Sequence, residues 1–566
     1  MDDVDAVQAQ IARNMLQSGD WITARLDGVA YLEKSPLVYW MMAASYRIFG
    51  VHDWAARLPL AIAVVLLCFV TYRFARWGFG GEAGLYAGLI LATSVGLFLF
   101  TRILIPDATL TLVITGAIWC VLRLLEPDEE VRYPRRWAAL LGACVGAGLL
   151  LKGLIAVVFP VGAGLIYMLV TRQLFSLRAW RKLNLPVIVL TALVVAGPWH
   201  VLATLANPPY FVFSLHSGPG QYHGFFWFYF FNEHLLRFLN LRYPHDYNTV
   251  PRYLFWLLTL AWLFPWSAYL PATMRLSFRP ESRAGRVRLM AVCWFSVVMV
   301  FFTFSTTQEY YSMPMYPALA LLISSAMLSG GKWIRIASTC LATIMATLFV
   351  TLATLLVLVW RIPAVGDISS ALTQNPDLYT LSLGHMADLT IGAFAYLRLP
   401  LAVAAMAFAA ATCGLLGFRT SIRRSALVLA ASMVIFFQAA RLALVRFDAY
   451  LGSYPLARAL EQAPPGKLIE ANAYYAFSSV FFYTNRTALL LNGRVNNLEY
   501  GSNAPGAAPV FIGDHEFAGL WAEPQRYYLL TYGTDMSHLE QIVGRSNLHL
   551  VQENAGNYLL SNHPVR

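Results

Sequence analysis

Long apolar runs separated by short polar segments dominate this chain up to about residue 444. Runs of this length cross roughly 30 Å of hydrocarbon as helices. Beyond residue 444, helix-like stretches such as PLARALEQA alternate with strand-like ones such as RYYLLTYG, which predicts a small α/β domain. We predict about twelve membrane-spanning helices, at residues 56–74, 83–100, 108–125, 137–151, 153–171, 186–204, 253–272, 288–304, 312–330, 335–360, 399–417 and 424–444.

The composition supports a polytopic α-helical membrane protein. Of the 566 residues, 58% are hydrophobic and 13% are charged, and the mean hydropathy is +0.56, which is far above that of a soluble domain. We therefore divide the chain into a first outer segment (1–55), a transmembrane domain (56–444) and a C-terminal soluble α/β domain (445–566). The long loop 205–252 contains GFFWFYFFNEHLLRF, which predicts one or two amphipathic helices at the membrane surface.

The positive charge follows membrane topology. The formal net charge is +11, but the basic residues gather in alternate loops, for example 132–136, 172–182, 275–286 and 419–424. This alternation places those loops in the cytoplasm. The loops between them, which are nearly free of basic residues, then lie outside. The alternation argues against a nucleic-acid partner, because the charge does not cover one soluble face.

The start of the chain raises a topological question. The alternation places residues 1–55 outside, yet neither a signal peptide nor a membrane-spanning run precedes them. We therefore expect a further apolar helix upstream, missing because of a late start codon.

Ionisable residues in the outer segments are the candidates for chemistry, because charge among apolar neighbours at a membrane surface is costly. Groups of opposite sign that meet there could bind a phosphate, directly or through a divalent metal held by carboxylates. The membrane midplane is almost free of ionisable groups, which argues against an ion-coupled transporter. The outer candidates include Asp2, Asp3, Asp5, Glu33, Lys34, Arg102, Asp107, Lys152, Glu233, His234, Arg237 and Glu309.

Several of these residues lie in motifs that resemble a known family. The segments SGDWITARLDGVAYLEKSPLVYW, RILIPDATL, LLLKG, NEHLLRF and EYYSMPMYPALALL occur in order. Their order and spacing are similar to those of GT-C glycosyltransferases related to lipid A aminoarabinose transferase and the protein O-mannosyltransferases. The block around YLEKSPLVYW is the most specific. Twelve visible spans and one missing helix would match the thirteen of that family.

The resemblance implies a GT-C fold and transfer of an aminoarabinose-like sugar or a hexose. The donor would be a polyprenyl-phosphate sugar and the acceptor a lipid or a protein, at the periplasmic face of the bacterial inner membrane. By position, Glu33 and Asp107 match the metal-site carboxylates of the family, and Lys34 matches a lysine that touches the donor phosphate. The metal could be Zn, Mg or Mn. We expect a monomer embedded among membrane lipids.

The catalytic carboxylate departs from the family pattern. A gapless match places it on Val4, so a shift of one residue points to Asp3 or Asp5 as the base that deprotonates or orients the acceptor hydroxyl. A phosphate acceptor would need no base. Further substrate contacts are predicted for Tyr31, Arg102, Lys152, Glu233, His234, Arg237 and Tyr311.

Each candidate also has an ordinary structural interpretation. Glu33 and Lys34 could form a surface ion pair, and Asp107 could cap the helix that follows it. Lys152 could extend from a helix end to the membrane surface, and Tyr311 could belong to an interfacial aromatic belt. The acidic N-terminus could be a solvated turn, and Glu233, His234 and Arg237 could simply hold the interfacial helix. Two other functions stay open: a protein O-mannosyltransferase-like enzyme and a flippase for lipid-linked sugars.

Overall fold

The predicted membrane runs form a bundle of helices. The computed structural model describes residues 1–127, 132–244, 250–305, 307–364 and 389–565, together with residues 366, 368 and 372. Within them, eight helices are long and apolar enough to cross a membrane, or nine if one bent pair is a single span. The main helices of the bundle are α3 (Asp53–Phe79), α4 (Gly81–Ala92), α6 (Asp107–Leu125), α7 (Pro134–Lys152), α8 (Ile155–Val170), α10 (Leu185–Ala206), α14 (Arg283–Phe304), α15 (Tyr316–Ser329), α16 (Lys332–Leu358), α17 (Arg398–Gly417) and α18 (Ile422–Leu451).

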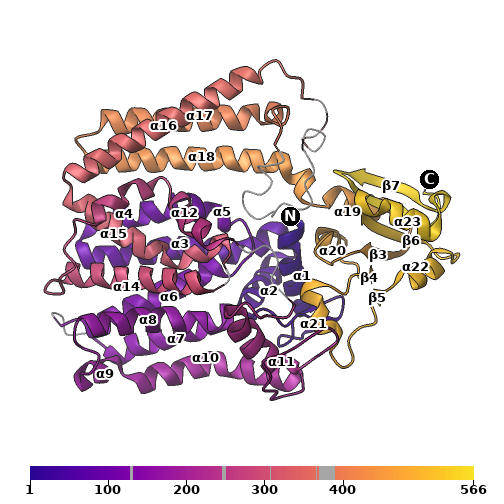
Figure 1. Cartoon of the computed structure of the whole chain (residues 1–566), viewed down its shortest axis with the longest axis horizontal. Coiled ribbons are helices and arrows are strands. Elements are labelled where there is room, and N and C mark those ends of the chain that lie inside the picture. The colour runs from indigo at the N-terminus through magenta and orange to yellow at the C-terminus, as the bar shows by residue number, and fades with distance from the viewer. Residues whose placement is uncertain are drawn as a thin grey trace.

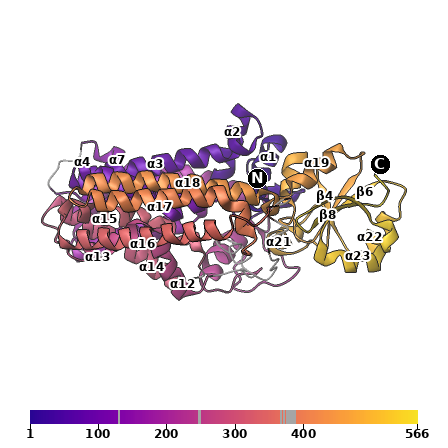
Figure 2. The same ribbon diagram turned by 90° about the horizontal axis from the view of Figure 1, so that it is seen from above.

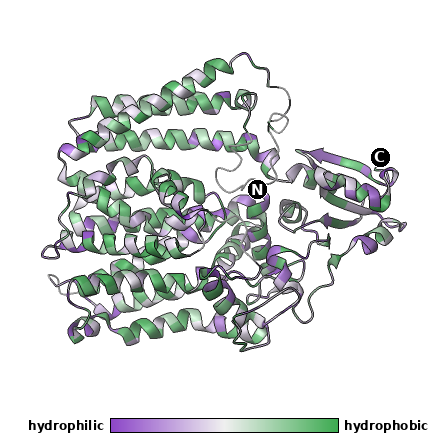
Figure 3. Ribbon diagram, in the orientation of Figure 1, coloured by the Kyte–Doolittle hydropathy of each residue, from purple (hydrophilic) through white to green (hydrophobic). Residues whose placement is uncertain are grey.

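The helices lie roughly side by side, and α17 packs between α16 and α18 at one edge of the bundle (Figure 1). Apolar residues dominate this part of the molecule, whereas the C-terminal part is mixed (Figure 3). The polytopic helical fold predicted from the sequence is confirmed. Helix α18 continues to Leu451, past the boundary predicted at residue 444.

Two of the predicted spans are broken helices. Residues 83–100 divide into α4 and α5 (Val95–Phe100), and residues 253–272 divide into α12 (Arg252–Trp262) and a segment at 97° to it, Trp266–Thr273. The second break contains Pro265, which has no N–H for the helical ladder. The two breaks meet: Val95 N donates to Phe264 O at 3.0 Å, and the Trp266 indole donates to Thr93 Oγ1 at 2.9 Å. Each break thus satisfies polar groups of the other.

The first outer segment fills the space between the bundle and the C-terminal domain (Figures 1 and 2). It comprises α1 (Asp3–Ser18), the short hairpin β1 (Arg25–Leu26) and β2 (Val29–Ala30), and α2 (Leu37–Phe49). Asp2 caps α1 by accepting from Asp5 N at 2.9 Å, and Gly19 ends it with φ 73°. Helix α1 buries one side against α2 and α20 (Ser478–Thr484) of the C-terminal domain.

The C-terminal residues form the predicted α/β domain. A six-stranded sheet has the order β5-β4-β3-β6-β8-β7, and β3, β4, β5 and β6 run parallel while β7 and β8 are antiparallel. Its inner strands are buried on both faces, as expected when helices cover both sides. Besides α20, the strands and main helices of the domain are α19 (Tyr454–Gln462), β3 (Lys467–Ala471), β4 (Ala488–Leu491), the short α21 (Glu499–Ser502), β5 (Phe511–Ile512), α22 (Asp514–Trp521), β6 (Tyr527–Tyr532), α23 (Met536–Val543), β7 (His549–Asn554) and β8 (Asn557–Ser561).

The long outer loop contains the predicted helix. Residues Gly224–Phe226 form α11, which continues as a π-helical segment, η1 (Trp227–Leu236). A loop then returns toward the first outer segment and carries Arg242. Most of the other predicted outer loop, 361–398, lies outside the described residues.

Candidate active site

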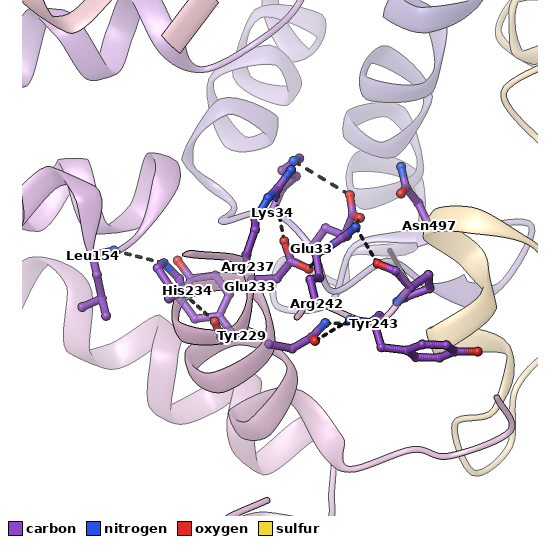
Figure 4. A network of polar contacts seen from close by, with 12 residues as sticks. Glu33, Lys34, Leu154, Tyr229, Glu233, His234, Arg237, Arg242, Tyr243 and Asn497 are labelled. Carbon is purple, nitrogen blue, oxygen red and sulfur yellow. Dashed lines mark hydrogen bonds and ion pairs between the residues drawn. The ribbon is translucent and has the colours of Figure 1, made fainter. Parts of the chain in front are cut away.

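Glu33 belongs to a network of buried charges between the bundle and the C-terminal domain (Figure 4). It lies in the loop between β2 and α2, and its side chain is only 4% exposed. Glu33 Oε1 accepts from the Arg242 guanidinium, which also donates from Nε to Glu233 Oε1 at 2.5 Å. Burial alone would raise the pKa of Glu33, but Arg242, Lys34 and Arg237 together hold that pKa below its usual value. Glu33 is thus ionised at neutral pH, and Arg242 bridges two carboxylates.

Lys34 stands at the exposed edge of this network. Its Nζ lies 3.8 Å from Glu33 Oε2, and its side chain is 33% exposed. Within the part of the chain that the structure describes, its ammonium group makes no hydrogen bond, because 3.8 Å is too long for one. Lys34 and Tyr31 line a pocket together with Trp199 and Phe225. The Lys34 ammonium therefore has donors available for an anionic ligand.

The π-helical segment supplies the second carboxylate. Glu233 is buried, and its Oε2 accepts at 3.0 Å from Nη1 of Arg237, the residue that directly follows the segment. Through Arg242, this pair connects to Glu33. The sequence predicted substrate contacts for Glu233 and Arg237, with a role in holding the interfacial helix as the alternative, and the structure places both in the same network as Glu33 and Lys34.

His234 holds a helix turn in place. Its Nε2 accepts from Leu154 N at 3.1 Å, and its Nδ1 bonds to Tyr229 O. An accepting Nε2 requires the proton on Nδ1, and burial lowers the pKa of the imidazole, which favours this neutral form. Gly153, at φ +75°, makes the approach possible, because a Cβ there would lie 1.9 Å from His234 Nε2. These contacts fix the position of the ring, and the predicted substrate contact of His234 stays a prediction.

Asp107 forms an ion pair with Lys152. Asp107 is the first residue of α6 and Lys152 the last of α7, and Lys152 Nζ donates to Asp107 Oδ1 at 2.6 Å. The same ammonium lies 4.3 Å from the centre of the Tyr311 ring, a cation–π distance. The cap position before α6 is taken by Pro106, so the carboxylate of Asp107 does not act as an N-cap.

The three N-terminal aspartates have separate partners. Asp3 Oδ1 accepts from Ser479 N at 2.7 Å and its Oδ2 accepts from Ser453 Oγ at 2.9 Å, so it ties α1 to the C-terminal domain. Asp5 Oδ1 accepts from Leu104 N at 2.7 Å, and its Oδ2 accepts from Arg57. Burial raises the pKa of both Asp3 and Asp5 to about 7.

Arg102 lies close to Asp5. Its backbone oxygen accepts from the Arg57 guanidinium that also binds Asp5. Its own guanidinium lies 5.7 Å from the centre of the Phe98 ring. The predicted catalytic and substrate-binding roles of Asp3, Asp5 and Arg102 stay predictions, and the contacts place Asp5 and Arg102 in one neighbourhood.

Two features of the site were not found from the sequence. Arg242 was overlooked because nothing marks an arginine in an aromatic loop as the partner of a residue 209 positions away. The C-terminal domain also reaches the network: Tyr475 Oη lies 2.9 Å from Tyr31 Oη, and Tyr243 Oη donates to Glu499. The sequence offered no signal for these contacts, which depend on how the two parts pack.

The carboxylates as placed do not fit a divalent metal. Both oxygens of Glu33 are occupied, one by Arg242 and the other by Tyr31 and Lys34, and Oδ1 of Asp107 is occupied by Lys152. No group of three or more His, Cys, Asp or Glu side chains within the described ranges could hold a metal ion. The predicted metal at Glu33 and Asp107 stays a prediction, and no step below depends on it.

Comparisons with known proteins bear on the fold. The model of the family described as dolichyl-phosphate-mannose-protein mannosyltransferase matches residues 33–201. The crystal structure of ArnT from Cupriavidus metallidurans bound to undecaprenyl phosphate superposes with a TM-score of 0.79 at 23% identity, covering 99% of this chain and 93% of that one. This chain has the ArnT fold. The GT-C fold expected from the sequence motifs is confirmed, and so is the resemblance to ArnT.

Curated proteins of similar sequence match this chain over part of their length. An undecaprenyl phosphate-α-4-amino-4-deoxy-L-arabinose arabinosyl transferase of Pseudomonas fluorescens is 30% identical over 342 residues, which are 58% of this chain and 54% of the relative. A second one from that species is 28% identical over 388 residues, covering 67% of this chain and 61% of the relative. The chain thus spans about half to three fifths of the length of these relatives.

Proposed function

We propose that this chain is a glycosyltransferase that moves a sugar from a polyprenyl-phosphate donor to a lipid acceptor. The observation that carries the proposal is the Lys34 ammonium, which makes no hydrogen bond to the described residues and lies beside a fixed network of Glu33, Arg242 and Glu233. The matching ArnT structure was solved with undecaprenyl phosphate. The donor and the aminoarabinose-like sugar are inferred from the names of these relatives, and the lipid A-like acceptor from the resemblance of the sequence motifs.

In the proposed reaction, Lys34 binds the phosphate of the donor. As the bond between the sugar and the phosphate oxygen breaks, negative charge grows on the leaving phosphate, and a nearby ammonium stabilises it without having to reorient. Arg242 holds Glu33 ionised and in place, and Glu33 in turn lies 3.8 Å from Lys34. The Glu33 carboxylate therefore stands beside the ammonium group that would bind the phosphate.

Asp5 is the better candidate for a base if the acceptor is a hydroxyl. Its pKa of about 7 suits proton transfer near neutral pH, and it lies against the loop before Asp107. Both carboxylates accept two hydrogen bonds, but the partners of Asp5 are Leu104 N and Arg57, whereas those of Asp3 belong to the C-terminal domain. The family model that matches residues 33–201 favours a second candidate function, transfer to a protein hydroxyl, in which the base is required.

The proposed setting is the bacterial inner membrane, with the site and the C-terminal domain in the periplasm. The alternation of basic loops supports this orientation, since it puts the loops that carry Glu33 and Arg242 outside. The protein would act as a monomer among membrane lipids.

Sugar transfer by the purified chain in detergent or vesicles tests the proposal. The assay supplies a radiolabelled polyprenyl-phosphate sugar and separates lipid, protein and free-sugar products. We expect transfer by the wild type and a loss of about a hundredfold in Lys34→Ala, the size seen when one charge-stabilising donor is removed. Lys332→Ala is the matched control, because this lysine is exposed at the start of α16.

The product distinguishes the alternatives. Label in lipid supports the proposed acceptor, and label in protein supports the mannosyltransferase-like activity. Movement of intact donor across the vesicle membrane without bond cleavage would contradict both and favour a flippase.

A further inference from the structure

A chain of hydrogen bonds runs from the C-terminal domain to Glu33. Asn497 Nδ2 donates to Tyr475 Oη at 2.9 Å. Tyr475 Oη lies 2.9 Å from Tyr31 Oη, and Tyr31 Oη donates to Glu33 Oε2 at 3.0 Å. Tyr31 and Glu33 are both buried, so this end of the hydrogen-bond chain is shielded from water.

The direction of the chain is fixed by its two ends. An ionised carboxylate can only accept, so the Tyr31 hydroxyl donates to Glu33 and must accept from Tyr475. The Tyr475 hydroxyl therefore donates its proton to Tyr31, and its oxygen accepts from the Asn497 amide. Each donor polarises the next, which strengthens the last bond, the one on Glu33.

The remaining contacts of Glu33 explain why this bond matters. Its other oxygen, Oε1, accepts from Arg242, while Lys34 lies 3.8 Å from the same Oε2 that Tyr31 contacts. A carboxylate that lost Tyr31 could rotate about its last torsion, and that rotation would change its geometry toward both basic residues. A shift of about 1 Å in such a site is enough to reduce catalysis strongly.

We propose that Tyr475 and Asn497 of the C-terminal domain are positioning residues for the active site, acting through Tyr31 on Glu33. The C-terminal domain thus completes the site, and sugar transfer depends on its docking against the first outer segment. The inference rests on the proposed function and assigns these two side chains a role in it.

The decisive variant is Tyr475→Phe, which removes one hydroxyl and keeps the ring. The matched control is Tyr483→Phe in the same domain, because Tyr483 Oη donates to Asp53 Oδ2 at 2.6 Å across the same junction but does not touch the chain. Tyr475→Phe loses one hydrogen bond between the C-terminal domain and the rest of the protein, and Tyr483→Phe loses two, because Tyr483 Oη also accepts from Met1 N at 2.7 Å. Only Tyr475→Phe interrupts the hydrogen-bond chain that leads to Glu33.

Steady-state kinetics provide the first measurement. We expect kcat of Tyr475→Phe to fall about tenfold with KM for the donor within about twofold, because positioning for the transition state acts on kcat. We expect Tyr483→Phe to match the wild type. In a double-mutant cycle, Tyr475→Phe should have no further effect in a Tyr31→Phe background. Equal kcat values for Tyr475→Phe and Tyr483→Phe, or additive effects of Tyr475→Phe and Tyr31→Phe, would overturn the proposal.

Infrared spectroscopy provides a measurement that does not require turnover. The carboxylate stretching band of Glu33 is the band lost in Glu33→Gln, and its frequency responds to hydrogen bonding. At a fixed neutral pH, we expect it to shift in the same direction in Tyr31→Phe, Tyr475→Phe and Asn497→Leu and to stay in place in Tyr483→Phe. Asn497→Leu serves as a second break in the chain if Tyr475→Phe does not fold.

The two measurements separate the inference from the proposed function. A wild type that transfers no sugar would contradict the proposed function, while the infrared shifts would still support the chain. An unchanged Glu33 band in Tyr475→Phe and Asn497→Leu would show that the hydrogen-bond chain does not act on Glu33, even if the wild type is an active transferase.

Discussion

Lys152 and Asp107 form an ion pair at 2.6 Å that joins the end of α7 to the start of α6. The Asp107 side chain is 2% exposed, and its second oxygen, Oδ2, is buried without a hydrogen-bond partner among the described residues. The aspartate therefore depends on a single cation for its compensation. Removal of that cation would leave a buried charge with no partner.

We expect Lys152→Met to lower the melting temperature by several degrees, because breaking a buried ion pair costs about 3 to 5 kcal/mol. The double variant Lys152→Met with Asp107→Asn should recover most of the loss, since no buried charge remains. Thermal unfolding in detergent measures both. Arg545→Met is the control: it removes an exposed partner of Glu540 and should leave the melting temperature unchanged. A double variant no more stable than Lys152→Met would contradict this account.

Arg242 should matter to activity through its two carboxylate partners. In Arg242→Ala, Glu33 and Glu233 would lie buried without the guanidinium that bridges them. We expect transfer to fall by about a hundredfold or more. Arg242→Lys should recover only a small part of it, because an ammonium group cannot reproduce the planar geometry of the guanidinium. Initial rates of sugar transfer give the comparison, and equal rates for Arg242→Lys and wild type would show that charge alone suffices.

Asp3 should make stability depend on pH. Its pKa is about 7 in the folded protein, because burial raises it, against about 3.8 in the unfolded chain. The folded state then binds the proton more tightly, so the stability that this group contributes is complete below about pH 4 and is lost as pH rises to about 7. Asp3→Asn stays neutral and can still accept from Ser479 N.

Melting curves between pH 5 and pH 8 test this. We expect the melting temperature of the wild type to fall as pH rises toward 7, and that of Asp3→Asn to fall less. At pH 8, Asp3→Asn should be at least as stable as the wild type. A variant that is less stable at pH 8 and equally dependent on pH would show that Asp3 is ionised in the folded protein.

Metal dependence can be measured directly. Because Arg242 and Lys152 already compensate Glu33 and Asp107, we expect chelation with EDTA to change the transfer rate by less than about twofold. Mass spectrometry of the purified protein before and after chelation would identify any bound ion. Activity that disappears with EDTA and returns with Zn, Mg or Mn would instead support a metal held by the two carboxylates.

The sequence by itself determined the membrane helices and the α/β domain. Apolar run length and strand-like alternation are local properties, and each of the twelve predicted runs contains helix. It also determined which residues to examine, because charges such as Glu33 and Lys152 are conspicuous among apolar neighbours. The helix breaks near Ser94 and Phe264 were missed, since the backbone bond that joins them, from Val95 N to Phe264 O, links residues far apart in the sequence.

Only the tertiary structure decided which charges meet. Glu33 and Asp107 look alike in sequence, but one is held by Arg242 and the other by Lys152. Asp3 and Asp5 are two residues apart, yet they bond to different parts of the molecule. An ion pair depends on distance through space and on exclusion of water, and packing sets both. For the same reason, the contact between Tyr31 and Tyr475, 444 residues apart, emerged only from the folded chain.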